Sequence, residues 1–264
     1  MNPTAARVLT LNNRAVAMLR HGSEKLCLRM LKEAMETLYQ QAREDEDSSM
    51  VCVESTPSAP PSSPIGKATD RGQMQLRSLD ESEWGVEEDE EEDYSALVHS
   101  AAIKLNADGR GNVDDDYRLV YSRALVLADS AAKHPDVILS CVLYNLGLVS
   151  HLRGICTQIE ARFRTALRLY EMAFEIIQLH DDQGIFDDIL ILALVNNMVY
   201  SQQRLGNPDE ARKQNEFLRA LVGIGAPASS HTGACPDYCL QVDESDYFFF
   251  YLNALEERVS APAA

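Results

Sequence analysis

The chain of 264 residues lacks the short motifs that mark common enzyme classes. Gly109-Arg110-Gly111 is not followed by the glycine and lysine of a phosphate-binding loop, and neither G-x-S-x-G nor H-E-x-x-H occurs. The acidic residues between positions 106 and 116 do not form a calcium loop, because no frame supplies both a central glycine and a terminal glutamate. We therefore expect a protein that is not an enzyme and uses no cofactor.

The chain also lacks a disulfide framework, a secretory signal and a membrane span. Its six cysteines show no framework spacing, and Cys27 and Cys141 lie in apolar helical patterns, as reduced thiols do. The first twenty residues spread three arginines through an amphipathic pattern without a continuous apolar region. The longest apolar runs are short and interrupted by asparagine. These features predict a cytoplasmic or nuclear protein that does not enter a membrane.

Basic residues are scarce. The chain has 24 Lys and Arg residues against 41 Asp and Glu residues, which gives a net charge of −17. From Arg43 to Ser95 there are sixteen acidic and four basic residues, so one segment carries most of the excess. This balance argues against binding of nucleic acid or anionic membranes through broad electrostatic attraction. The expected partner is a protein or peptide, basic if it is charged.

Helical periodicity is present, most clearly from residue 135 to 222. Residues 137–152 are apolar on almost every face, and such a helix has to be covered on several sides. Gly154 is expected to end it. The next helix carries small and large residues at i, i+4 and i+7, namely Ala166, Tyr170 and Ala173.

Other segments have similar patterns. The pattern from about residue 184 to 205 leads through a turn at Gly206 into a fourth helix with acidic residues in its first turn. Residues 4–43 form a further hairpin, divided near Gly22. Residues 115–133 are also expected to be helical, because they repeat the second-helix spacing at Tyr117, Tyr121 and Ala124.

The arrangement resembles the tetratricopeptide repeat, in which Leu-Gly lies on the first helix of a pair and Ala-x3-aromatic-x2-Ala on the second. The matching residues are Leu143, Leu146, Gly147, Ala166, Tyr170 and Ala173. The units are degenerate, because the interval from Gly154 to Ala166 is seven residues too long unless the register runs through Phe163. In the last pair, Asn215 and Leu218 replace the expected aromatic residue and Ala. The resemblance implies an all-α fold, a short solenoid of antiparallel helix hairpins.

Composition divides the chain into four parts. They are an N-terminal hairpin (1–43), a disordered insert rich in Pro, Ser and acidic residues (44–93), the repeat region (94–222) and a flexible tail (223–264). Within the apolar segment 247–255 of the tail, the run Tyr247–Leu252 suits a strand that pairs with residues 96–105 in a small two-stranded sheet. Docking into the helical groove and self-association are the alternatives.

An asparagine stands nine residues before each glycine between paired helices. These residues are Asn13, Asn145 and Asn197, and an arginine follows each of them after seven or eight residues, at Arg20, Arg153 and Arg204. Positions i and i+7 share a helix face, so stacked hairpins would align the side chains. By resemblance to tetratricopeptide proteins, whose first helices line a concave groove, these residues would bind an extended peptide. The sequence thus predicts a non-enzymatic adaptor or scaffold; the alternative is that the asparagines bond locally and the arginines project into water.

A second hypothesis concerns the tail. His231, Cys235 and Cys239 form H-x3-C-x3-C, whose residue types suit a zinc or redox centre in a regulatory protein. Only Asp237 or Asp243 is near enough in sequence to be a fourth ligand, and Cys-x3-Cys is also compatible with ordinary loop residues. The metal content of the purified protein distinguishes a metal centre from ordinary loop residues.

The acidic insert is open to two interpretations as well. It is either a solvated segment that increases solubility, or a switch in which Ser62, Ser63 or Ser78 accepts phosphate. The insert could also fold back onto the arginines of the groove. Loss of residues 44–93 without a change in partner affinity would exclude that autoinhibition.

Overall fold

The computed structural model describes residues 2–50, 120–180, 186, 188–224, 240 and 250. Within these ranges the chain forms α-helices, one short 3-10 helix and no named strand, which confirms the predicted all-α class. The elements are α1 (Pro3–Arg20), α2 (Glu24–Met50), η4 (Asp129–Lys133), α5 (Pro135–Thr157), α6 (Glu160–His180), α7 (Asp188–Arg204) and α8 (Pro208–Ile224).

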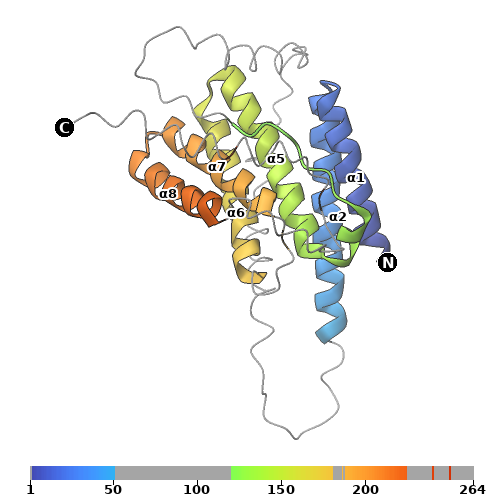
Figure 1. The fold of residues 1–264 in the computed structure, drawn as a ribbon. Helices are drawn as coiled ribbons and strands as arrows, with labels where there is room; N and C mark the ends of the chain where they lie inside the picture. The colour runs from blue at the N-terminus through green and yellow to red at the C-terminus, as the bar shows by residue number, and fades with distance from the viewer. Residues whose placement is uncertain are drawn as a thin grey trace, which may run out of the picture.

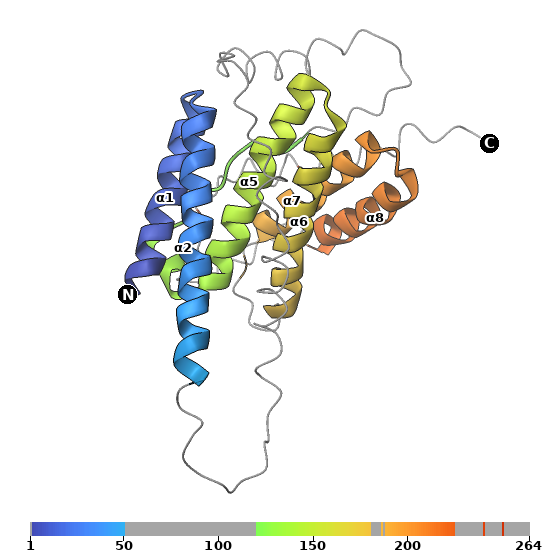
Figure 2. The same ribbon diagram turned by 180° about the vertical axis from the view of Figure 1, so that it is seen from behind.

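The helices pack in three pairs. α1 packs mainly on α2, α5 on α6, and α7 on α8, while α2 with α5 and α6 with α7 join neighbouring pairs. Figures 1 and 2 show the pairs side by side, in the order in which they occur in the chain. The first helices of the pairs also touch, α1 with α5 and α5 with α7. The three first helices therefore form one continuous layer.

Local sequence explains where the outer pairs begin and turn. The Asn2 side chain caps α1 by accepting a hydrogen bond from the Thr4 amide at 2.9 Å, and Pro3 occupies the first turn. Gly22 and Gly206 have φ values of 77° and 74°, in the left-handed region that favours glycine. These two glycines end the first helix of their pair, as the sequence predicts.

The middle pair turns differently. The prediction that Gly154 ends the helix is wrong, because α5 continues to Thr157 and Gln158 takes the left-handed conformation with φ 57°. A Cβ on Gly154 would lie 3.1 Å from the Phe163 ring, so this glycine allows α5 and α6 to approach closely. The additional helical turn accounts for the long interval between Gly154 and Ala166.

α2 is longer than expected. It continues to Met50, beyond the boundary that the sequence places after residue 43. Neither glycine nor proline occurs between Glu24 and Met50, so nothing interrupts the helix there, although the charge pattern changes. The first residues assigned to the acidic insert are therefore helical.

The segment of residues 120–128 is extended, and only residues 129–133 form a helix, the 3-10 helix η4. The predicted helix over residues 115–133 is thus wrong for residues 120–128, and residues 129–133 are helical only as a 3-10 turn. Figure 1 shows the segment as a thin green trace crossing α5 and α1. Its backbone bonds to side chains of the helix layer, which removes the need for helical hydrogen bonds.

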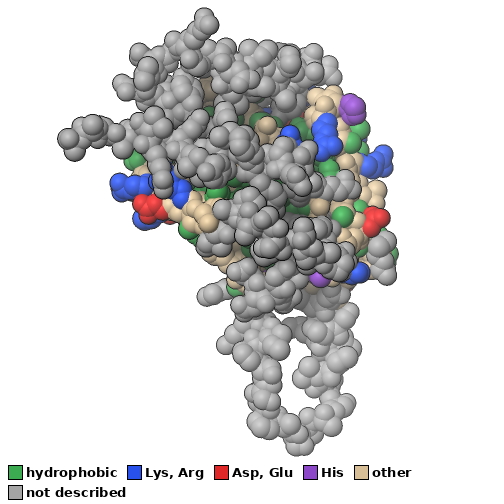
Figure 3. All heavy atoms as spheres, in the orientation of Figure 1, with side chains coloured by type: hydrophobic (Ala, Val, Ile, Leu, Met, Phe, Trp, Pro, Cys, Tyr) green, Lys and Arg blue, Asp and Glu red, His purple; other side chains and the backbone are tan. Residues whose placement is uncertain are grey.

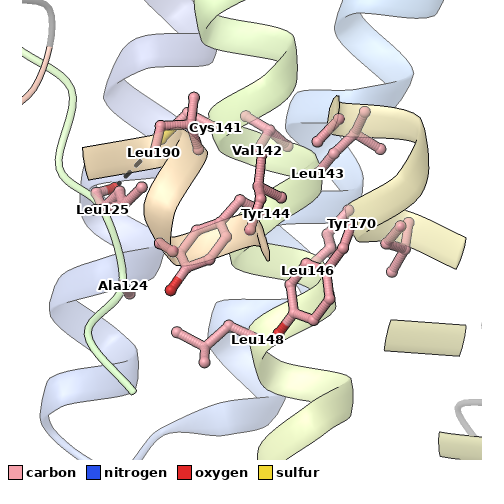
Figure 4. Packing of buried hydrophobic residues seen from close by; sticks show 14 of the residues in the cluster. Ala124, Leu125, Cys141, Val142, Leu143, Tyr144, Leu146, Leu148, Tyr170 and Leu190 are labelled. Atoms are coloured by element: carbon pink, nitrogen blue, oxygen red, sulfur yellow. Dashed lines mark hydrogen bonds between the residues drawn. The ribbon is translucent and has the colours of Figure 1, made fainter. Parts of the chain in front are cut away.

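α5 lies at the centre of the core. It is buried along nearly its whole length, and Figure 4 shows its Cys141 beside Leu125 of the extended segment and Leu190 of α7. By length and composition alone α5 could cross a membrane, contrary to the expectation from its interrupted apolar run, but 83% of its most apolar window is buried inside the protein. The neighbouring helices cover the apolar surface of α5.

The outer face of α8 is polar. Arg212 pairs with Asp209 at 2.7 Å and Lys213 with Glu210 at 3.0 Å, all on its first turns. Acidic and basic side chains lie side by side at this edge in Figure 3. Exposed pairs of this kind add little stability, so the face is simply solvated.

Several predictions concern residues outside the described ranges. These are most of the acidic insert with Ser62, Ser63 and Ser78, the segment 96–105, the H-x3-C-x3-C residues His231, Cys235 and Cys239, and the apolar segment 247–255 apart from Phe250. Phe250 is buried and its ring lies 4.8 Å from that of Tyr121, and Leu240 forms an isolated antiparallel bridge with Leu127. Leu240 and Phe250 of the tail therefore both lie against the extended segment.

Candidate peptide-binding site

Three asparagines, one from the first helix of each pair, hold the extended segment by its backbone. Each side chain accepts a hydrogen bond from the N–H of one residue and donates one to the C=O of the same residue. The pairs are Asn13 with Leu127 (2.9 and 2.7 Å), Asn145 with Leu125 (2.9 and 3.0 Å) and Asn197 with Tyr121 (2.9 and 3.0 Å). We refer to Asn13, Asn145 and Asn197 as the asparagine row.

The chemistry of the row is that of a strand edge. A carboxamide carries an acceptor and donors side by side, so it can pair with both polar groups of one extended residue, much as a neighbouring strand would. The bonded residues are two and four positions apart, spans of about 7 and 13 Å in extended chain. Such pairing recognises backbone conformation and is independent of the side chains bound.

Two neighbouring side chains reinforce the row, and sequence reasoning missed both. Asn12 accepts a hydrogen bond from Asn145 at 2.8 Å and donates one to the Leu125 carbonyl at 3.2 Å. The Tyr144 hydroxyl lies 3.2 and 3.1 Å from the carbonyl oxygens of Tyr121 and Arg123. In Figure 4 the Tyr144 ring extends from α5 toward the segment.

A signal for these partners is present in the sequence. Asn12-Asn13 and Asn196-Asn197 are doublets at equivalent positions of α1 and α7, and in each the first side chain donates to the second at 3.2 Å. The first asparagine orients the amide of the second. In α5, Tyr144 occupies the position of the first asparagine and reaches the segment directly.

The row is closed, where the sequence predicts an open groove. Asn145 and Asn197 are 1% and 0% exposed, and Asn13 is partly buried. The reason is that the segment does more than bond its backbone: its apolar side chains join the main core. The buried ones in that cluster are Tyr121, Ala124, Leu125 and Leu127.

The predicted arginines do not extend the row. Arg153 forms an ion pair with Glu24, which joins α5 to α2. Arg204 donates to the Gln158 side chain and its guanidinium lies 5.6 Å from the centre of the Phe163 ring. Arg20 is exposed in the last turn of α1. Each arginine lies about two helical turns from its asparagine, and at that distance Arg153 and Arg204 contact other parts of the protein instead of the segment.

The Glu24–Arg153 pair is a structural contact between the first two pairs of helices. Glu24 is buried and Arg153 is largely covered. Burial raises the pKa of the Glu24 carboxyl, and the nearby guanidinium opposes that shift. This bridge fixes the first pair of helices against the second and lies apart from the asparagine row.

His151 is an interior imidazole of α5. It is fully buried among the rings of Phe163, Tyr170 and Tyr200, and its Nδ1 lies 3.3 Å from the Tyr170 hydroxyl. Its Nε2 has no hydrogen-bond partner among the described residues. Burial lowers the pKa of His151 to about 3, so the ring is neutral at physiological pH.

The buried imidazole predicts a pH dependence of stability. The unfolded chain takes up a proton near the ordinary pKa of 6.5, whereas the folded protein does so only near 3, so protons favour unfolding as pH falls below 6.5. Between pH 7.5 and 5.5 this group should cost about 1.4 kcal/mol of unfolding free energy. Urea unfolding of wild type and His151→Leu at both pH values should show that difference only in the wild type.

The control is the exposed His21. His21→Gln should keep the pH dependence of the wild type. An unchanged difference in His151→Leu would contradict the assignment of the lowered pKa.

The described residues contain no cluster of side chains suited to a metal ion, because no group of three His, Cys, Asp or Glu side chains there could hold one. The described cysteines, Cys27, Cys141 and Cys156, are not joined by disulfides, and burial raises the pKa of Cys27 to about 12.

Comparison with family models, curated proteins and solved structures gives no match to this chain.

Proposed function

We propose that this protein is a non-enzymatic adaptor that holds an extended polypeptide on the layer formed by α1, α5 and α7. The observation that carries the proposal is the asparagine row, in which three helix pairs each contribute one amide to the backbone of a single extended segment. In peptide-recognition modules, main-chain hydrogen bonds supply affinity and side-chain pockets supply specificity. The row has the first property, and the buried side chains of the segment point to the second.

The helix pairs are further proposed to be tetratricopeptide-like units of a short solenoid. Support comes from the residues that carry the resemblance: a Cβ on Gly147 would lie 2.6 Å from the Tyr170 ring and 3.3 Å from the Ala166 carbonyl oxygen. The aromatic residue of the second helix thus packs directly against a glycine on the first. Close packing of α5 on α6 leaves the opposite side of α5 free to join the layer that it forms with α1 and α7.

The adaptor requires that residues 120–128 give way to a partner. The donors and acceptors that hold this segment would be equally available to a peptide of another protein. An occupant in the same chain lowers the apparent affinity for that peptide by the fraction of molecules in which the row is free. Binding in trans should therefore be weak in the wild type and stronger when the segment is loosened.

The test uses the full chain with Leu125→Ser and Leu127→Ser, which removes two buried side chains of the segment and keeps the row. We call this protein the opened variant. A library of random peptides long enough to span the row is selected on it, and in parallel on the same variant with Asn145→Ala and Asn197→Ala. Peptides enriched only where the row is intact are expected. Failure to enrich any, or equal enrichment on both proteins, overturns the proposal.

Loss of two core leucines can prevent folding. If the opened variant is unfolded alone, recovery of its helical circular dichroism on addition of peptide replaces binding as the measurement. A ligand that binds only the folded form stabilises that form. The expected and overturning results are then the same, with refolding in place of capture.

A further inference from the structure

The segment held by the row shows which of its positions are buried. Within residues 120–127, Ser122 and Arg123 are exposed and Val126 is partly buried. The buried residues are Val120, Tyr121, Ala124, Leu125 and Leu127. From its N-terminal end, the segment therefore has an aliphatic residue, an aromatic residue, two exposed residues, a small residue, and two leucines separated by one position.

The buried side chains belong to different surroundings. Val120 clusters with Ile155 and Phe163, at the junction of α5 and α6, away from the main core. The Tyr121 ring packs on Phe250, and Leu125 lies beside Cys141, whose Sγ is 3.6 Å from the Leu125 carbonyl oxygen. Val120 is thus enclosed apart from the main core, to which Tyr121 and Leu125 belong. Buried side chains of this kind supply sequence preference to a row that otherwise binds only backbone.

Charge adds a further restriction. Residues 120–128 contain one arginine and no acidic residue, in a chain whose net charge is −17. A peptide with acidic residues would be repelled by the chain as a whole, and a row of amides and a phenol offers no cation to offset the cost of burying a carboxylate. The occupant is thus complementary in charge to the protein that holds it.

We infer that residues 120–128 stand in for the natural ligand, and that the partner is a protein presenting an extended, neutral to basic peptide with the same pattern of buried residues. The partner binds by displacing the segment, so the chain itself regulates access to the row. This inference rests on the proposed adaptor function and specifies the ligand of the same site.

A second copy of the chain is a poorer occupant than a separate peptide. Immediately after the segment, η4 packs on α1 with Ala131 and Ala132 buried, and α5 begins at Pro135. To insert its own segment into another molecule, a copy would have to detach η4 from α1 and lose those contacts. A separate peptide has no such requirement.

The experiment uses a fluorescent peptide with the sequence of residues 119–129, titrated against the full-length wild type and the opened variant. Fluorescence anisotropy should give a Kd at least about tenfold lower for the opened variant, because its own segment competes less well. A peptide with Asp in place of both leucines, the positions of Leu125 and Leu127, should bind at least about tenfold more weakly. Glu in place of Arg123 should weaken binding mainly at low salt.

The outcomes separate this inference from the proposed function. If library peptides bind through the row and the peptide of residues 119–129 does not, the ligand pattern is wrong and the adaptor function stands. If neither binds, the adaptor function fails and the inference with it. Concentration-dependent dimers of the wild type in light scattering, abolished by the peptide, would identify a second copy as the occupant and overturn the assignment of a separate partner. For an opened variant that is unfolded alone, refolding by each peptide gives the same comparison.

Discussion

Asn145→Ala should lower the free energy of unfolding by about 3–5 kcal/mol, measured by urea denaturation followed by circular dichroism at 222 nm. The substitution removes both hydrogen bonds to Leu125 and the one to Asn12, in a site that is 1% exposed. It leaves the Leu125 amide and the Asn12 oxygen buried without this partner, and each such group costs about 1–3 kcal/mol. The middle of the asparagine row should therefore be among the most sensitive polar positions of the protein.

Two further variants test this explanation. Ser140→Ala removes another buried polar group of α5, whose contact with the Ala173 carbonyl is long at 3.5 Å, and should cost less than about 1 kcal/mol. Asn145→Asp keeps the shape of the side chain but places an acceptor against the Leu125 carbonyl and the Asn12 oxygen. It should be at least as destabilising as Ala; a tolerated Asp would mean that shape, and not bonding, holds the segment.

Gly147→Ala should destabilise the protein by about 3 kcal/mol, although Ala is the better helix former. The new Cβ would lie 2.6 and 2.9 Å from two atoms of the Tyr170 ring, which is itself fully buried. Neither the ring nor the helix backbone can move without disturbing the core, and overpacking of this kind typically costs 1–3 kcal/mol or more. Thermal unfolding followed by circular dichroism would measure the loss.

Gly223 provides a matched control. It lies in α8, and nothing is within 4 Å of the position of an added Cβ. Gly223→Ala should therefore stabilise the protein by up to about 1 kcal/mol through helix propensity. In addition, Tyr170→Leu should make Gly147→Ala less costly than it is in the wild type. Equal effects of the two glycine substitutions would contradict the close packing of α5 on α6.

The helices and the asparagine row could be predicted because their signals are local or regular. Apolar periodicity marks α5 and α7, and Gly22 and Gly206 mark turns that require a left-handed backbone. The row was visible as a recurrence, since each asparagine occupies an equivalent place on the first helix of its pair. That recurrence indicates alignment, and the structure places all three side chains on one segment.

What the row holds could not be predicted in this way. The backbone groups of Tyr121, Leu125 and Leu127 bond to side chains 20 to 114 positions away, so no local pattern indicates an extended conformation. The spacing of Tyr117, Tyr121 and Ala124 even imitates a helix. The same limitation explains the arginines: a helix face can be read from the sequence, but the partner of Arg153 on α2 depends on how two pairs of helices meet.

The order in which the segment crosses the helix pairs has a consequence for biosynthesis. Along the segment, Tyr121 is bound by α7, Leu125 by α5 and Leu127 by α1. The segment therefore contacts the helix pairs in the reverse of the order in which the ribosome synthesises them. When the segment emerges during translation, Asn13 has already been synthesised. Asn197, which lies 76 residues after Tyr121 in the chain, has not. In a nascent chain the hydrogen bonds between the asparagine row and the segment therefore form first at Leu127. The bonds between Asn197 and Tyr121 form last, after α7 has been synthesised.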